Sequence, residues 1–212
     1  MACAICSVRR PRRFCPGVHA DICTLCCGTQ REVTVDCPLD CEYLREAHLH
    51  ERAHRVEPED LPNRDVPVSE EFLEGHQPLL ASIASALGAA ALRTPGIIDL
   101  DLREALDAAI RTQRTLQSGL VYESLPANPL AAQVCRALLQ AVADFRNLEY
   151  EKLGLHQTRD SDILPILVFL QHFELTLNNR RPRSRAFLGT LLDYYPPAPG
   201  SEPPEPSSLI LP

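Results

Sequence analysis

The residues with the clearest chemistry in this chain are cysteines, and eight of the nine lie within the first 41 residues. They are Cys3, Cys6, Cys15, Cys23, Cys26, Cys27, Cys37 and Cys41. Close pairs of cysteines suit a metal ion, because a tight turn or one turn of helix points both sulfurs at the same site. A segment this short buries too little apolar surface to fold by itself, so metal–thiolate bonds or disulfides must stabilise it.

The choice between metal and disulfides depends on the cellular compartment. No apolar stretch of signal-peptide type follows Met1, and the longest apolar run, 163–170, is far shorter than the ~20 residues of a membrane helix. We therefore expect a cytoplasmic or nuclear protein without a membrane segment. Dense thiols in a reducing compartment favour zinc over disulfides or an iron–sulfur cluster. Eight thiolates make two four-ligand sites, so we expect two zinc ions per chain.

The cysteine spacing resembles that of cross-braced zinc fingers of the HIT and MYND type, which are treble-clef folds. The resemblance covers roughly the first 45 residues: a C-x-x-C pair, Phe-Cys-Pro at 14–16, the run at 22–27, and a final C-x-x-x-C pair that opens a helix. It implies that one zinc is held by Cys3, Cys6, Cys23 and Cys26. It further implies that Cys15, Cys37 and Cys41 supply three ligands of the other zinc.

The chain departs from this pattern at the second pair, because Cys15 has no cysteine partner at the expected spacing. Two residues can complete the second site. Cys27 would use every cysteine of the segment, whereas His19 would keep the cross-braced pairing and leave Cys26 or Cys27 without a metal. Zinc accepts either type of ligand. We expect Cys27, with His19 as the alternative.

A second motif with metal chemistry follows the cysteines. A helix is predicted from Pro38 to about Arg55, and it contains His50, Glu51 and His54 in the order H-E-x-x-H. On one helix face the two imidazoles would bind zinc, and the carboxylate would act as a general base, as in metallopeptidases. Only 49 residues precede the motif, the finger occupies them, and no recognisable third ligand follows. A solvated helix face is therefore the preferred interpretation.

The rest of the chain predicts an all-helical body. Aromatic residues make up only 5% of the sequence and Trp is absent, while Leu and Ala are abundant, which favours helices. Apolar residues at helical spacing, separated by capping and breaking residues, indicate five or six helices over 68–195. The acidic, proline-containing stretch 57–67 predicts a linker from the finger at 1–56, and the proline-rich stretch 196–212 predicts a flexible tail. The predicted fold is therefore mostly α, with a small two-zinc finger followed by a helical bundle.

Two residues of the predicted body have distinct expectations. Asp101, followed three residues later by Glu104, resembles a capping box and predicts a helix with Asp101 as its N-cap. Cys135 lies among apolar residues at helical spacing, which indicates a small core residue and not a redox-active thiol.

Basic residues gather in two clusters, although the chain as a whole is acidic. The net charge is −7; residues 1–56 are close to neutral and residues 57–212 carry −8. This distribution argues against extensive nucleic-acid binding, which needs clustered positive charge. The first cluster lies in the finger and contains Arg9, Arg10, Arg12 and Arg13. The second, at 180–185, is either a solvated loop or a contact for an acidic partner or a nucleic-acid backbone.

Together, these features favour a non-enzymatic zinc-binding adaptor or regulatory protein. Fingers of the HIT and MYND type are chiefly protein-interaction modules, so the resemblance implies that the finger, with the cluster Arg9–Arg13, docks a protein or ribonucleoprotein partner. One alternative is a zinc metallopeptidase that uses His50, Glu51 and His54. Another is a thiol–zinc redox sensor, in which oxidation releases the metal. No phosphate-binding glycine loop or nucleophile elbow indicates a small-molecule substrate.

Overall fold

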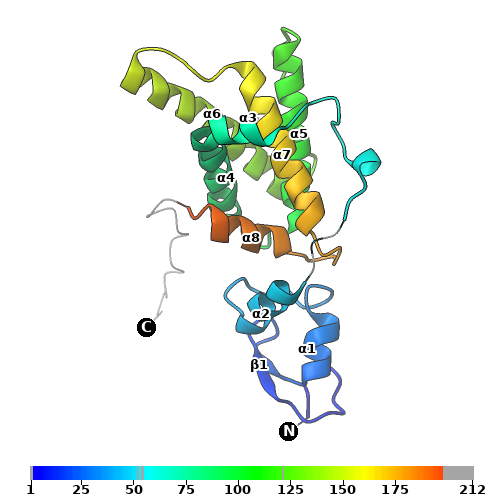
Figure 1. The fold of residues 1–212 in the computed structure, drawn as a ribbon. Helices are drawn as coiled ribbons and strands as arrows, with labels where there is room; N and C mark the ends of the chain where they lie inside the picture. The colour runs from blue at the N-terminus through cyan, green and yellow to red at the C-terminus, as the bar shows by residue number, and fades with distance from the viewer. Residues whose placement is uncertain (1, 52, 54, 121, 198–212) are drawn as a thin grey trace, which may run out of the picture.

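The chain forms a small N-terminal finger and a larger helical body (Figure 1), described by a computed structural model for residues 2–51, 53, 55–120 and 122–197. The finger contains strands β1 (Arg13–Cys15) and β2 (Ala20–Ile22) and helices α1 (Thr24–Gln30) and α2 (Glu42–His50). The body contains α3 (Glu70–Gly75), α4 (Gln77–Leu92), α5 (Asp99–Gln117), α6 (Pro129–Leu153), α7 (Asp160–Leu177) and α8 (Ala186–Tyr194). Because six α-helices follow residue 68 in the described part, the predicted mostly α fold is confirmed. Most of the predicted tail, 198–212, lies outside the described residues.

The finger is built around a short antiparallel hairpin. Strands β1 and β2 pair in the register Arg13 with Ile22 and Cys15 with Ala20. The turn between them passes so close to the segment before Cys37 that a Cβ at Gly17 would collide with the carbonyl oxygen of Asp36. Glycine at this position therefore lets the hairpin pack directly against the segment that precedes Cys37.

Helix α2 is shorter at both ends than the predicted helix from Pro38 to Arg55, so that prediction was wrong. Cys41 is its N-cap, with extended dihedrals, and a turn in which the N–H of Cys41 donates to the carbonyl oxygen of Pro38 at 3.1 Å precedes it. The helix ends at His50, because Glu51 adopts an extended conformation. The H-E-x-x-H motif therefore does not lie on one helix, and His54 falls outside the described residues.

The helical body has one continuous apolar core. Helix α5 packs most extensively against α7, and α4 against α6, while α8 lies across the end of the bundle that faces the finger (Figure 1). The largest fully buried side chains of the body include Ile83, Leu87, Leu102, Leu106, Ile110, Leu138, Ile166, Leu167 and Phe187. Cys135 is fully buried within this core, which confirms its predicted place. None of the helices in the described part has the length and apolarity needed to cross a membrane.

The start of α5 differs from the predicted capping box. The N-cap is Ile98, three residues before the predicted N-cap Asp101, and the helix begins at Asp99. Asp101 is the third helical residue, and its carboxylate accepts a hydrogen bond from the N–H of Ile98 at 2.9 Å. Asp99 is fully buried and caps a different helix: its carboxylate accepts the N–H groups of Phe187 and Leu188, both at 3.0 Å, in the first turn of α8. A buried acid thus joins α5 to the N-terminus of α8, where negative charge is favoured.

The predicted linker, 57–67, runs along the body and makes specific contacts with it. It contains a short 3-10 helix, η1 (Pro58–Asp60). The amide of Asn63 donates to Gln171 of α7 at 2.8 Å, and the guanidinium of Arg114 on α5 donates to both carboxylate oxygens of Asp65 at 2.7 Å. The segment that connects finger and bundle is therefore itself held on the bundle surface.

Candidate metal centre and its junction with the helical body

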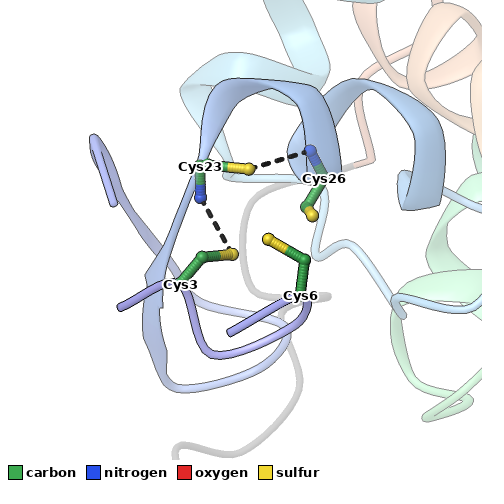
Figure 2. Close-up of side chains that lie close together, drawn as sticks. All are labelled: Cys3, Cys6, Cys23 and Cys26. Atoms are coloured by element: carbon green, nitrogen blue, oxygen red, sulfur yellow. Dashed lines mark hydrogen bonds between the residues drawn. The ribbon is translucent and has the colours of Figure 1, made fainter. Parts of the chain in front are cut away.

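Four cysteines of the finger gather in one compact cluster. The sulfurs of Cys3, Cys6, Cys23 and Cys26 all lie within 4.8 Å of one another, and Figure 2 shows the two pairs facing each other from two separate segments. They are the same four residues that the resemblance groups in one site. Cys23 is the N-cap of α1 and Cys26 lies in its first turn, so the start of this helix fixes one pair. The cluster can hold a metal ion, and four sulfur ligands suit tetrahedral zinc.

Backbone N–H groups support the sulfurs of this cluster. The N–H of Cys23 donates to the sulfur of Cys3 at 3.2 Å, and the N–H of Cys26 donates to the sulfur of Cys23 at 3.4 Å (Figure 2). The N–H groups of Arg9 and Val8 lower the pKa of the Cys6 thiol to about 6. Burial, with the hydrogen bonds of neighbouring thiols, raises the pKa of Cys26 to about 12. A cation at the centre would favour the thiolate form of all four.

The remaining four cysteines of the finger surround a second, less compact position. Cys15, Cys27, Cys37 and Cys41 all line one cavity of about 10 Å³, which is closed by apolar side chains that include Ile22, Val35 and Leu44. Within the described residues, no three of these sulfurs lie within 4.8 Å of one another. Burial is the main cause that raises the pKa of Cys37 to about 11, and the nearby charges of Cys15 and Cys41 add to the shift. His19 is exposed, in the turn between β1 and β2.

Two arginines converge on Cys27. The guanidinium of Arg13 donates to its sulfur at 3.6 Å and also lies 4.2 Å above the ring of Tyr43, and the guanidinium of Arg31 approaches the same sulfur at 3.9 Å. The Nε of Arg31 is buried and has no acceptor in the part of the chain that the structure describes. Two positively charged donors therefore face the same sulfur. Arg13 therefore differs from the rest of its cluster, because it faces the interior of the finger.

A third group of potential ligands lies where the finger meets the body. Glu32, which is fully buried, accepts a hydrogen bond from His48 at 3.0 Å, and Glu51 lies 3.9 Å from the same imidazole nitrogen. The amide of Asn179 donates to both carboxylates, at 2.7 Å to Glu32 and 3.0 Å to Glu51. Because protein donors already satisfy these oxygens, the group is a polar latch between finger and body. We refer to Glu32, His48, Glu51 and Asn179 as the junction latch.

The junction latch holds opposite charges in a partly buried position. Burial alone would raise the pKa of Glu32, but the hydrogen bond and charge of His48, with the N–H of Arg185, outweigh it and lower that pKa. Burial likewise opposes the charged form of His48, but the hydrogen bond and charge of Glu32 dominate and raise its pKa. Each group therefore stabilises the charge of the other. Glu51, which would be the general base in the alternative metallopeptidase interpretation, belongs to this latch.

The second basic cluster, 180–185, contacts the finger. Arg185 is buried and donates to the carbonyl oxygens of Ile97 and Cys37, both at 2.8 Å, and it also pairs with Asp36. The N–H of Arg183 donates to the carbonyl oxygen of Glu32 at 2.8 Å. The sequence predicts a solvated loop or a contact for an acidic partner or a nucleic-acid backbone at this cluster, whereas Arg181, Arg183 and Arg185 pair with acids of the finger in the same chain. No sequence signal identified Glu32 or Asn179 as interacting residues, since 147 residues separate them.

Comparisons with protein-family models, with curated protein sequences and with solved structures give no match to this chain. The HIT and MYND resemblance thus rests on the cysteine spacing, and the four clustered sulfurs are compatible with a zinc finger of some type. The function must therefore be argued from the geometry of the cysteines and of the junction with the body.

Proposed function

We propose that this chain is a non-enzymatic adaptor in which a two-zinc finger, fixed to a helical bundle, docks a protein partner. The observation that carries the proposal is the mutual approach of the sulfurs of Cys3, Cys6, Cys23 and Cys26 to within 4.8 Å. A site with four protein ligands leaves no position for a catalytic water, so a zinc there stabilises the fold.

The second zinc in this proposal is bound by Cys15, Cys27, Cys37 and Cys41. Their shared cavity and the two guanidinium groups at Cys27 support this assignment. The buried Nε of Arg31 would gain charge-assisted attraction from a Cys27 thiolate bound to zinc. His19, which is exposed in a turn, is the less favoured fourth ligand.

The contacts between finger and body support an adaptor more than an independent finger on a tether. Glu32 is fully buried, and residues from both sides of the junction satisfy its carboxylate: His48 from the finger, and Asn179 and the N–H of Arg185 from the body. Interactions of this kind fix the orientation of the finger relative to the bundle. A partner bound to the finger would then be held in a defined position relative to the body.

The test of the proposed function is the zinc content of the purified full chain. We expect two zinc ions per chain, and one after Cys3→Ser, because that change leaves three ligands in the first site. Cys27→Ser should lower the occupancy of the second site, whereas His19→Ala should leave two ions bound. Cys135→Ala serves as the matched cysteine control and should retain both ions. A chain that contains no zinc and has disulfides among its first eight cysteines would overturn the proposal.

A further inference from the structure

Part of the acidic charge of the finger is used in contacts with the helical body. Three of its acidic side chains, Glu32, Asp36 and Glu51, face the helical body and contact residues of the loop before α8. Strand β1 and the N-terminal loop lie at the opposite end of the finger, away from the body (Figure 1). The docking of the finger thus uses these three acids, whereas Arg9, Arg10 and Arg12 take no part in it.

The loop before β1 and β1 itself carry five exposed residues that we call the distal face, namely Val8, Arg9, Arg10, Arg12 and Phe14. Asp21, the partner of Phe14 on β2, is the exposed acid beside them. All five residues are exposed, and among the apolar ones Val8 is 83% and Phe14 is 59% exposed. None of the three arginines forms an ion pair within the described part of the chain. The distal face therefore combines positive charge without a partner and apolar side chains without cover.

We propose that the distal face binds an acidic peptide segment of another protein, in which carboxylates alternate with apolar side chains. This inference rests on the proposed adaptor function and names its partner by chemistry. The guanidinium groups of Arg9, Arg10 and Arg12 match carboxylates in charge and in hydrogen-bond geometry. Val8 and Phe14 supply the apolar contacts that provide binding energy at the centre of an interface.

The composition of the distal face favours a peptide over a nucleic acid. Three guanidinium groups neutralise only about three phosphates, which gives weak and strongly salt-dependent binding to a single strand. Base stacking needs aromatic platforms, and Phe14 is the one aromatic residue of this face. Val8 has no counterpart on a phosphate backbone, whereas it fits an apolar side chain of a peptide.

The test uses a fluorescent peptide of about 12 residues with alternating Glu and Leu, titrated with the zinc-containing full chain by fluorescence anisotropy. The triple change Arg9→Glu, Arg10→Glu and Arg12→Glu should weaken binding by about tenfold or more, because it replaces attraction by repulsion. The matched control, Arg45→Glu with Arg64→Glu and Arg93→Glu, changes three other exposed arginines by the same total charge. This control should stay within about twofold of the unchanged chain.

A second comparison tests the apolar part of the distal face. Val8→Ser with Phe14→Ser should weaken peptide binding by about fivefold without a change in net charge. A single-stranded RNA of equal length that binds more tightly than the peptide would overturn the inference in favour of a nucleic acid. If a chain that contains two zinc ions does not bind the peptide, this inference is overturned and the proposed function still stands. Absence of zinc would overturn the proposed function, and the inference with it.

Discussion

The finger and the helical body achieve their stability by different means, although one chain forms both. The body buries a continuous set of Leu, Ile, Ala and Val side chains on all of its long helices. The buried interior of the finger consists of five cysteines and only three apolar residues, Ile22, Val35 and Leu44. Hydrophobic burial can stabilise the body alone, whereas in the proposed function a bound metal stabilises the thiol-rich finger.

The junction between these regions uses a third means, a polar network. Glu32 accepts hydrogen bonds from His48 within the finger and from Asn179 across the junction, and the pKa of Glu32 is lowered while that of His48 is raised. Networks of this type have directional geometry and fix orientation well, but they contribute less net stability than an apolar interface of equal size. The three regions should therefore respond differently to metal removal, core truncation and loss of charge.

The largest expected effect is that of zinc removal by a strong chelator. Structural zinc in small fingers contributes on the order of 10–16 kcal/mol, so the finger should unfold without it. The helical signal in far-UV circular dichroism should fall only slightly, because α1 and α2 contain 7 and 9 residues. Loss of most helical signal together with the zinc would show that the body depends on the metal. This result would contradict the stabilisation of the body by apolar burial alone.

Truncation in the core of the body should have the second largest effect. Leu106 is fully buried on α5, and Leu106→Ala should lower the free energy of unfolding of the body by about 2–5 kcal/mol through lost burial and a new cavity. Denaturation followed by circular dichroism measures this change. The zinc content should stay at the unchanged value, and its loss on this substitution would show that finger and body fold as one unit.

Loss of charge at the junction should affect docking and leave both regions folded. Glu32→Gln removes the negative partner of His48 in a buried position, at a cost of roughly 2–4 kcal/mol to the docked arrangement. Amide hydrogen exchange should accelerate over 31–37 and 178–185, with zinc retained. Glu46→Gln, at an exposed position of α2, is the matched control and should leave exchange unchanged. Equal protection in both variants would mean that the latch does not hold the finger in place.

The smallest expected effect is a pH dependence within the body. Burial raises the pKa of Asp99 to about 6, although hydrogen bonds from Ser184 and the first turn of α8 partly oppose the shift. A raised pKa means that the folded state binds the proton of Asp99 more tightly than the unfolded state does. The resulting contribution to stability is present below about pH 4 and is lost as the pH rises through 6. The free energy of unfolding of the unchanged chain minus that of Asp99→Asn should therefore fall by roughly 1–3 kcal/mol from pH 4 to pH 7. A difference that rises over this range would contradict the assignment.

The parts of the fold that depend on local sequence could be predicted. Helical periodicity indicated the bundle, and cysteine spacing indicated the metal-binding segment. Helix α2 could not be delimited, because its end is set by Glu51, which leaves the helix to meet Asn179 from the other end of the chain. The same holds for Asp99, whose local position indicated a helix start but whose partners on α8 lie almost 90 residues away (88 and 89 residues). Contacts between residues so distant in sequence leave no periodic or spacing signal in a single chain.

The assignment of Cys27 remained a choice between two ligand types at the sequence level. Spacing alone allowed Cys27 or His19, since zinc accepts both. The structure adds the positions of Arg13 and Arg31, which approach the sulfur of Cys27, and the exposure of His19. Tertiary contacts around the ligand, and not its distance along the chain, therefore favour the cysteine.

The most direct test of two closed zinc sites is zinc-edge X-ray absorption of the purified full chain. The proposal predicts an average first shell of four sulfurs at ~2.3 Å for two zinc ions per chain, with no nitrogen or oxygen. A shell of three sulfurs and one nitrogen in half of the sites would assign His19 as a ligand. Oxygen in the first shell, as from bound water, would contradict the claim that both sites are closed and structural.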